Sequence, residues 1–283
     1  MTISYDALAR DIERFAETPA GEPLPPDAGA AIEAALDALE SGALRAAQRD
    51  ARGTWQAVPW VKRAILLAFR ISRVVVIPAG AGAGYTDKET MPPRWFTPTD
   101  GIRLVPGGSS VRRGAHLAAG VVCMPPMYVN VGAWVGAGTM IDSHALVGSC
   151  AQIGERVHLS AAAQIGGVLE PVNASPVVIE DGVMVGGNCG VYEGTVVRQG
   201  AVLGAGVILT RGTPVYDLVR ETVYRGSADR PLEIPENAVV VPGARQVTAE
   251  WARGQGLALQ TPIIVKYRDE KTDIATTLEQ WLR

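Results

Sequence analysis

The sequence predicts a mainly β protein built around a left-handed parallel β-helix, with an α-helical domain before it and a small strand and helix extension after it. Two observations predict the coil. Apolar residues recur at every sixth position from residue 105 to residue 165 and again from residue 179 to residue 215, and near residue 101 the composition changes to one rich in Gly, Val, Ile and Ala without a helical period. A six-residue period fits neither an ordinary strand nor a helix and is typical of a hexapeptide β-helix.

Residues 1–100 are expected to form a mainly helical domain. Helical spacing of apolar residues covers residues 4–12 and 27–39, and Pro19 to Pro26 and Gly42 mark boundaries. The run from Pro78 to Gly84 alternates Gly and Ala but lacks both the Lys-Ser/Thr pair of a phosphate-binding loop and GxGxxG spacing. A linker is the favoured interpretation of that run.

Residues 101–241 are expected to form the coil. Three hexads make one turn of about 18 residues, so each aliphatic side chain points inward and neighbouring turns stack on one another. Small residues at the second and fifth hexad positions suit tight corners. Hexapeptide coils wind left-handed, against the usual right-handed rule for parallel crossovers. The phase breaks over an excursion at residues 167–177, and the aliphatic positions on its two sides are Val105, Val111, Leu117, Cys123, Val129, Val135, Ile141, Val147, Ile153, Leu159 and Ile165, then Ile179, Val185, Val191, Val197, Leu203, Leu209 and Val215.

Residues 242–283 are expected to be a C-terminal extension. Residues 257–267 have the pattern of a strand, and residues 276–282 could form a last short helix. This extension is expected to cover the open end of the coil.

Composition favours a small-molecule partner in the cytoplasm. The chain has 283 residues, a formal net charge of −3 and mixed charges, which indicates no surface for nucleic acid or an anionic membrane. No apolar run is long enough to cross a bilayer, and the N-terminus lacks the layout of a signal peptide. Cys123, Cys150 and Cys189 are too few for a disulfide framework and are expected to be buried, reduced thiols.

Residues 140–154 and 157–160 resemble the signature of the tetrahydrodipicolinate N-succinyltransferases, a family of hexapeptide-repeat acyltransferases. Residues 41–45, 101–106, 127–133 and 165–171 also match, so the resemblance covers nearly the full chain. It implies transfer of a succinyl group from succinyl-CoA to the amine of tetrahydrodipicolinate in its ring-opened amino-keto form, in lysine and diaminopimelate biosynthesis. It further implies a homotrimer with sites between subunits and no metal.

Acyl transfer needs a base that accepts the amine proton and donors that hold the oxyanion. The resemblance assigns Asp142 to contact with the substrate amine and Arg103 to a substrate carboxylate, which a guanidinium holds well. The alternatives are an aspartate tolerated at the second hexad position and a solvated arginine at the start of the coil.

Two departures from the family pattern concern the base. Family members carry Ser-Glu-Val-Val-Glu-Gly where this chain has Cys-Gly-Val-Tyr-Glu-Gly at residues 189–194, so Gly190 replaces an acidic residue implied to be catalytic and Glu193 is the carboxylate that remains. His144 stands close to Asp142, where the family has tryptophan. Since imidazole titrates near the operating pH, we hypothesise that His144 shares the proton transfer; the alternative is a histidine without a chemical role.

Coenzyme A in this fold lies along a groove between neighbouring coils. The resemblance therefore suggests cofactor contacts late in the coil and near its end, at Gly204, Ala205, Gly206, Arg211 and Lys266.

Three alternatives stay open from the sequence. The chain could be an acyltransferase of the same fold that uses acetyl-CoA or a different amino diacid, or a non-catalytic scaffold. It could also bind zinc between subunits as γ-type carbonic anhydrases do. His116, His144 and His158 are expected on three different faces of the coil, so they cannot meet within one subunit.

Overall fold

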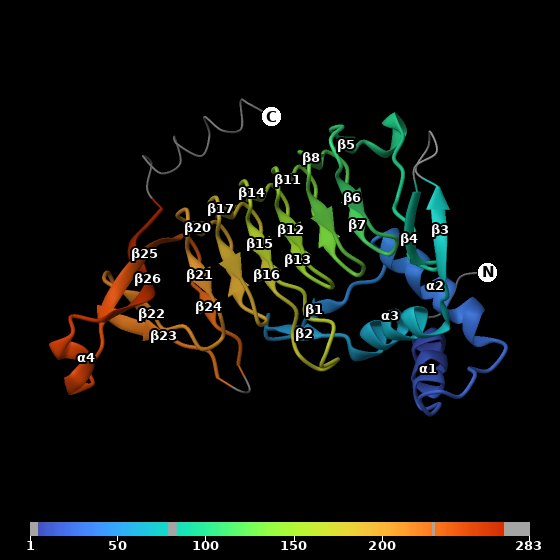
Figure 1. Cartoon of the computed structure of the whole chain (residues 1–283), viewed down its shortest axis with the longest axis horizontal. Helices are drawn as coiled ribbons and strands as arrows, with labels where there is room; N and C mark the ends of the chain where they lie inside the picture. Colours follow the sequence, from blue (N-terminus) through green and yellow to red (C-terminus); the bar gives the residue numbers. More distant parts are fainter. Residues whose placement is uncertain (1–4, 79–83, 228–229, 269–283) are drawn as a thin grey trace.

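The computed structural model describes residues 5–78, 84–227 and 230–268. Its centre is a three-sided coil of short strands, with the N-terminal helices at one end and the C-terminal strands at the other (Figure 1). Each side of the coil is a parallel sheet in which successive turns pair in register. The predicted parallel β-helix is therefore confirmed, while its left-handedness stays a prediction.

We number the three faces by the order in which the chain first visits them. Face 1 contains β5 (Arg103–Leu104), β8 (Val122–Cys123), β11 (Met140–Ile141), β14 (His158–Leu159), β17 (Met184–Val185), β20 (Val202–Leu203) and β25 (Ala238–Gln246). Face 2 contains β6 (Ser110–Val111), β9 (Tyr128–Val129), β12 (Leu146–Val147), β15 (Gln164–Ile165), β18 (Gly190–Val191) and β21 (Ile208–Leu209). Face 3 contains β7 (His116–Leu117), β10 (Trp134–Val135), β13 (Gln152–Ile153), β16 (Val178–Ile179), β19 (Val196–Val197) and β24 (Glu233–Ile234). The stacked turns between two faces form edge 1–2, edge 2–3 and edge 3–1.

The second residue of each short strand points inward and the first points outward. The predicted aliphatic positions from Val111 to Leu209 are all at most 5% exposed and form one continuous core. The first position of the predicted series was wrong, because Leu104, not Val105, pairs with Cys123. Val215, the last position, is fully buried in the same core, but its strand β22 (Val215–Asp217) extends the face 1 sheet instead of continuing on face 3.

Steric crowding explains the small residues at the corners. A Cβ on Gly136, at edge 3–1, would lie 2.6 Å from the backbone carbonyl of Gly154 in the next turn. Real Cβ atoms do not approach backbone so closely, so residue 136 itself has no room for a side chain. The corner pattern is thus a consequence of the spacing between stacked turns.

The N-terminal residues form three helices and two hairpins. The helices are α1 (Tyr5–Ala16), α2 (Ala28–Glu40) and α3 (Pro59–Ile71); the hairpins are β1 (Ala47–Arg49) with β2 (Trp55–Ala57) and β3 (Val74–Pro78) with β4 (Gly84–Lys88), followed by the short 3-10 helix η1 (Pro98–Asp100). The helices predicted at residues 4–12 and 27–39 are confirmed. The Gly-Ala run starts and ends in β3 and β4, but residues 79–83 lie outside the described residues.

The N-terminal domain packs on edge 2–3. Ile12, Leu36 and Ile65 from its three helices share a buried cluster with Val131 and Cys150 of the coil. The β1–β2 hairpin lies on face 3. Glu180, 5% exposed, binds this hairpin: its Oε1 accepts from Trp55 Nε1 at 2.9 Å and from Arg49 at 2.7 Å.

The C-terminal part begins with a second excursion that the sequence analysis missed. After β21 the chain forms β22 and β23 (Thr222–Tyr224) before it returns to face 3 at β24. β25 then pairs with β26 (Ala258–Tyr267), and the short helix α4 (Glu250–Gly254) joins them. The strand predicted at residues 257–267 is confirmed; the helix predicted at residues 276–282 lies outside the described residues.

All three cysteines are free and buried, as predicted. Burial raises the pKa of the Cys123 and Cys150 thiols to about 12, so both stay protonated. Among the described residues, no helix is long and apolar enough to cross a bilayer.

Candidate functional site

Asp142 and His144 share one turn of edge 1–2. This turn joins β11 to β12, and the Asp142 Oδ1 accepts a hydrogen bond from the Ser143 backbone N–H at 2.7 Å. Asp142 is half-buried, whereas His144 is exposed and has a left-handed φ of 63°. The turn therefore fixes the carboxylate and leaves the imidazole facing solvent beside it.

The turns of edge 1–2 stack directly from Asp142 to Gly204. Backbone hydrogen bonds of 2.9–3.0 Å run from Ala162 N–H to Ser143 O, from Asn188 N–H to Ala161 O and from Gly206 N–H to Gly187 O. Gly204, Ala205 and Gly206 thus lie on the same edge as Asp142, three strand spacings or about 15 Å away. The small residues between them leave this edge open to an extended ligand.

Arg103 on face 1 and Lys266 on β26, which extends the same sheet, lie at the two ends of one row of outward residues. The register runs through the outward residues Arg103, Val122, Met140, His158, Met184, Val202, Val239 and Lys266. Arg103 is exposed and stands two strands, about 10 Å, from Met140. Face 1 therefore brings a guanidinium to the same side of the coil as the Asp142 carboxylate.

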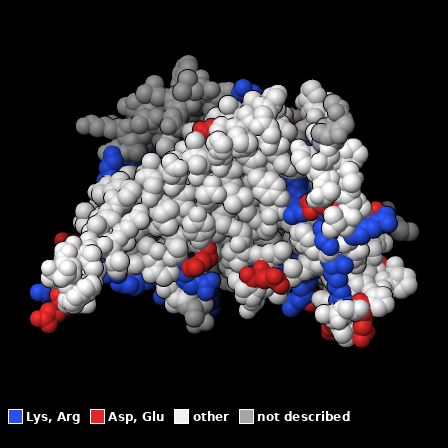
Figure 2. Space-filling view, viewed as in Figure 1, with Lys and Arg blue, Asp and Glu red and all other residues white. Residues whose placement is uncertain are grey.

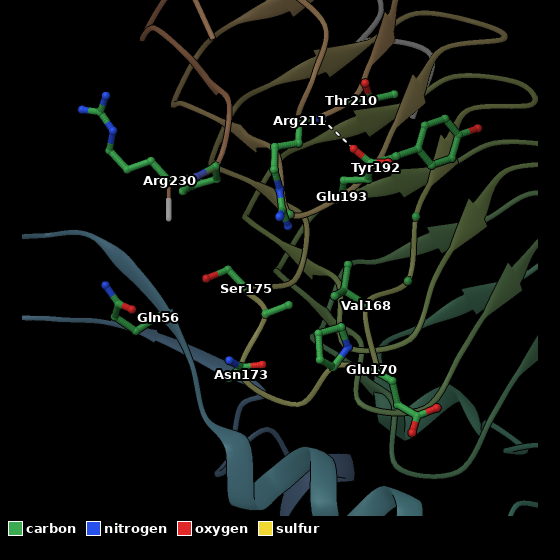
Figure 3. A pocket seen from close by; sticks show the side chains of 16 residues that line it. Gln56, Val168, Glu170, Asn173, Ser175, Tyr192, Glu193, Thr210, Arg211 and Arg230 are labelled. Carbon is green, nitrogen blue, oxygen red and sulfur yellow. Dashed lines mark hydrogen bonds between the residues drawn. The ribbon is translucent and has the colours of Figure 1, made fainter. Parts of the chain in front are cut away.

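Glu193 and Arg211 lie at a different place, edge 2–3. They line a cavity of about 1020 Å³ whose wall also includes Glu170, Arg230 and Gln56 (Figure 3). The Glu193 carboxylate accepts a hydrogen bond from the Arg211 backbone N–H at 3.0 Å, and Figure 3 shows the Arg211 side chain extending from this contact into the cavity. The cavity combines carboxylates with guanidinium groups, a composition that suits a polar ligand with groups of both charges.

Within one chain, the predicted residues thus form two groups. Asp142 and Glu193 lie on opposite sides of face 2, because the turn with Asp142 precedes β12 and the turn with Glu193 follows β18. Asp142 shares its side of the coil with His144, Arg103, the three residues Gly204 to Gly206 and Lys266, while Glu193 shares the other edge with Arg211 alone among the predicted set. A single chain therefore does not bring all of these residues together.

The excursion between β15 and β16 forms the outer wall of the cavity, and contacts with α3 hold this loop in place. Lys62 of α3 is fully buried, and its Nζ donates a hydrogen bond to the Ala174 carbonyl at 2.5 Å. Burial lowers the pKa of Lys62. The Ser175 hydroxyl also donates to the Trp55 carbonyl, at 3.4 Å. The N-terminal domain thus positions the loop that closes the cavity.

Replacing Lys62 with methionine is expected to loosen the excursion. A hydrogen bond from a charged donor contributes about 1.5–3 kcal/mol, so backbone amides of residues 167–177 should exchange with solvent about 10- to 100-fold faster. Hydrogen exchange measured by mass spectrometry tests this. Arg63→Met is the matched control, because Arg63 pairs with Glu13 at 2.5 Å. Equal exchange in both variants would show that Lys62 does not hold the loop.

The three histidines do not occupy three separate faces as expected. His116 lies on face 3, but His158 lies on face 1 and His144 follows the neighbouring face 1 strand β11, which pairs with β14. The expectation assigned His116 and His158 to the face on which their hexads begin. In the structure the last residue of a hexad is the first residue of the next strand, so both histidines lie one face further on. Among the described residues, no group of three His, Cys, Asp or Glu side chains could hold a metal ion.

Several cavity residues were missed by sequence reasoning. Glu170, Gln56 and Arg230 come from the excursion, the β1–β2 hairpin and the approach to β24, which meet only in the folded chain. The break in the six-residue phase at residues 167–177 was the one signal that marked this region. Tyr192 also lines the cavity, and its departure from the family pattern was visible in the sequence.

Comparison with known families gives two matches. Residues 10–71 match the profile described as tetrahydrodipicolinate N-succinyltransferase N-terminal. Residues 176–211 match the profile described as hexapeptide repeat of succinyl-transferase. The two matches fall on the N-terminal domain and on the late turns of the coil.

Curated relatives resemble the chain over most of its length. A 2,3,4,5-tetrahydropyridine-2,6-dicarboxylate N-succinyltransferase from Nitrobacter winogradskyi is 44% identical over 262 residues, 89% of each chain. One of the same name from Polynucleobacter asymbioticus is 40% identical over 93% of this chain and 92% of its own.

A solved structure from Campylobacter jejuni, described as a 2,3,4,5-tetrahydropyridine-2-carboxylate N-succinyltransferase, aligns with a TM-score of 0.52 at 18% identity. The alignment covers 83% of this chain and 62% of that chain. At this identity the likeness supports the fold alone.

Proposed function

Since the chain belongs to the tetrahydrodipicolinate N-succinyltransferase family, we propose that it transfers the succinyl group of succinyl-CoA to the amine of ring-opened tetrahydrodipicolinate, in lysine and diaminopimelate biosynthesis. The observation that carries this proposal is 44% identity to a relative of that name across 89% of both chains. The presence of Asp142 and Arg103 on one side of the coil agrees with it.

In the reaction we propose, the amine nitrogen attacks the thioester carbonyl. The C–N bond forms, the C–S bond breaks, coenzyme A leaves as the thiol, and the amine proton passes to a base. Asp142 would orient the amine, and Arg103 would hold a substrate carboxylate. The edge of small residues from Asp142 to Gly206 would receive the extended acyl-CoA, with Lys266 at its far end. Arg211, on the other edge, would reach the phosphates only from a neighbouring copy.

We propose that the active enzyme is a homotrimer. Two observations support this: the two groups of predicted residues lie on different edges of one chain, and a broad side of the coil carries few charged side chains (Figure 2). In that view, charges gather over the N-terminal domain and the lower margin. A surface depleted of charge is typical of a subunit interface. A neighbouring copy would bring its Glu193 edge to the Asp142 edge.

The proposed location is the cytoplasm. Three free thiols without a disulfide among them agree with a reducing compartment.

The test is the release of coenzyme A thiol from purified protein with tetrahydrodipicolinate and either succinyl-CoA or acetyl-CoA. The proposed function requires faster release from succinyl-CoA. Faster release from acetyl-CoA, or activity with another amino diacid only, would favour the same-fold alternative, which the Gly190 and His144 departures support. If no thiol is released from either acyl-CoA with any amino diacid, acyl transfer is contradicted.

His144 is proposed to share proton transfer with the carboxylates. His144→Asn is the informative variant, because asparagine tolerates the left-handed conformation that residue 144 adopts. We expect kcat to fall about 10-fold or more and the acidic limb of the pH profile to change, since general-base help contributes about 10²–10⁴-fold in total. Unchanged turnover and pH profile would remove His144 from the mechanism. The control is Arg156→Asn, which makes the same replacement at another left-handed position, in a turn of edge 3–1 away from the proposed site.

A further inference from the structure

The phenol ring of Tyr192 lies across two glycines at the outer surface of face 2. A Cβ built on Gly190 would lie 2.8 Å from the Tyr192 hydroxyl oxygen and 2.9 Å from Cζ. A Cβ built on Gly166, at the end of the neighbouring strand, would lie 2.8 Å from Tyr192 Cδ1. Since real Cβ atoms do not come so close, the ring excludes every side chain from position 190 in this conformation.

The Tyr192 hydroxyl points along face 2, away from the Glu193 and Arg211 side chains (Figure 3). Gly190 pairs in register with Gln164, whose side-chain amide donates to the His144 carbonyl at 3.1 Å. The phenol therefore stands over face 2 between the cavity at edge 2–3 and the turn that carries Asp142. Among the described residues, the hydroxyl has no hydrogen-bond partner.

The chemistry at this point is that of a neutral donor. A phenol hydroxyl can donate a hydrogen bond, whereas an ionised carboxylate only accepts. The family pattern has glutamate at position 190 and valine at position 192; this chain has glycine and tyrosine. The two replacements are one physical change, because the ring needs the space that a side chain at 190 would occupy.

We infer that Tyr192 is a specificity-determining residue of the acyl-transfer site, whose hydroxyl donates a hydrogen bond to a carboxylate or carbonyl oxygen of the acceptor. The inference rests on the proposed function and deepens it, since it states which acceptor chemistry face 2 selects. An acceptor with an oxygen at this point is favoured over one that offers a second ammonium group there.

The steric half of the inference is tested by a double-mutant cycle in thermal unfolding. Gly190→Ala is expected to lower Tm in the presence of Tyr192, because the new methyl group displaces the ring. In a Tyr192→Val background the same change should have little effect, so the two sites should couple. Additive effects of the two changes would overturn this half. The cycle does not depend on any activity.

The functional half is tested by Tyr192→Phe, which keeps the ring and removes the hydroxyl. We expect kcat/KM for the dicarboxylate acceptor to fall about 10- to 100-fold, mainly through a higher KM, while KM for acyl-CoA stays within about twofold. Tyr85→Phe, a change of the same kind on the exposed β4 strand, is the control and should match the wild type. Equal KM for the acceptor in Tyr192→Phe and the wild type would overturn the inference.

The double variant Gly190→Glu with Tyr192→Val places a carboxylate in the space that the ring leaves. We expect it to fold, to regain transfer relative to Tyr192→Val alone, and to shift preference within a panel of amino diacids and diamines toward acceptors with a second amine. An unchanged preference would count against the inference. If the wild type transfers no acyl group at all, the proposed function fails. Calorimetric binding then tests the inference: Tyr192→Phe should bind the dicarboxylate acceptor about 10- to 100-fold more weakly than the wild type, and equal affinity would overturn it.

Discussion

Replacing Asp142 with asparagine is expected to lower kcat/KM for succinyl transfer by about 10²–10⁴-fold, the usual contribution of one group that accepts or directs a proton. The fold should not change, since the amide oxygen of asparagine can still accept the 2.7 Å hydrogen bond from the Ser143 N–H. The loss would therefore report the charge of the carboxylate. Steady-state thiol release, with circular dichroism to check the fold, provides the measurement.

Asp181→Asn is the matched control for that prediction. Asp181 also lies in a turn of the coil and also accepts one backbone hydrogen bond, from the Glu155 N–H at 2.8 Å, but its turn belongs to edge 3–1. It should keep kcat/KM within about twofold of the wild type. An Asp142→Asn protein as active as Asp181→Asn would remove the carboxylate from the proposed reaction.

Replacing Leu203 with alanine is expected to lower the free energy of unfolding by about 2–5 kcal/mol. Leu203 is 1% exposed and fills the centre of the coil, where stacked turns leave no room for a neighbouring side chain to fill the cavity. Val202→Ala, in the same strand, changes an outward side chain and should cost much less. Chemical denaturation at one fixed protein concentration compares them, because assembly contributes to apparent stability. Equal losses would contradict the assignment of inward and outward positions.

The coil could be predicted because its geometry repeats. Each hexad places one apolar residue inward, as Ile141 and Val147 do, and the close approach of the next turn leaves no room for a side chain at corners such as Gly136. These constraints act locally, so they leave a period that a single sequence displays. The first predicted position, Val105, was wrong because the stack begins there and the constraint acts from one side only.

The N-terminal domain was only partly predictable. Helix α3 was not predicted, because its buried face includes Lys62, whose charge interrupts the apolar stripe that marks a helix. The burial of Lys62 makes sense only once the Ala174 carbonyl is in place, and that carbonyl belongs to a loop more than a hundred residues away.

The candidate site was predictable only in part, for a related reason. Asp142, His144 and the Gly204 turn could be placed from the repeat, since equal positions in successive hexads share an edge. The cavity around Glu193 and Arg211 depends on two irregular excursions and a hairpin, and irregular segments carry no period that places them. The exclusion of a side chain at Gly190 likewise became visible only from the position of the Tyr192 ring.

The central claim is that the Asp142 edge of one chain and the Glu193 edge of another complete one acyl-transfer site. The most direct measurement mixes equal amounts of Asp142→Asn and Glu193→Gln protein, each inactive alone, under conditions that dissociate and reassemble the chains. Random reassembly into trimers should restore about a quarter of the wild-type sites, each with one intact Asp142 edge facing one intact Glu193 edge, and thiol release should rise accordingly. A mixture no more active than its two parents would contradict the claim.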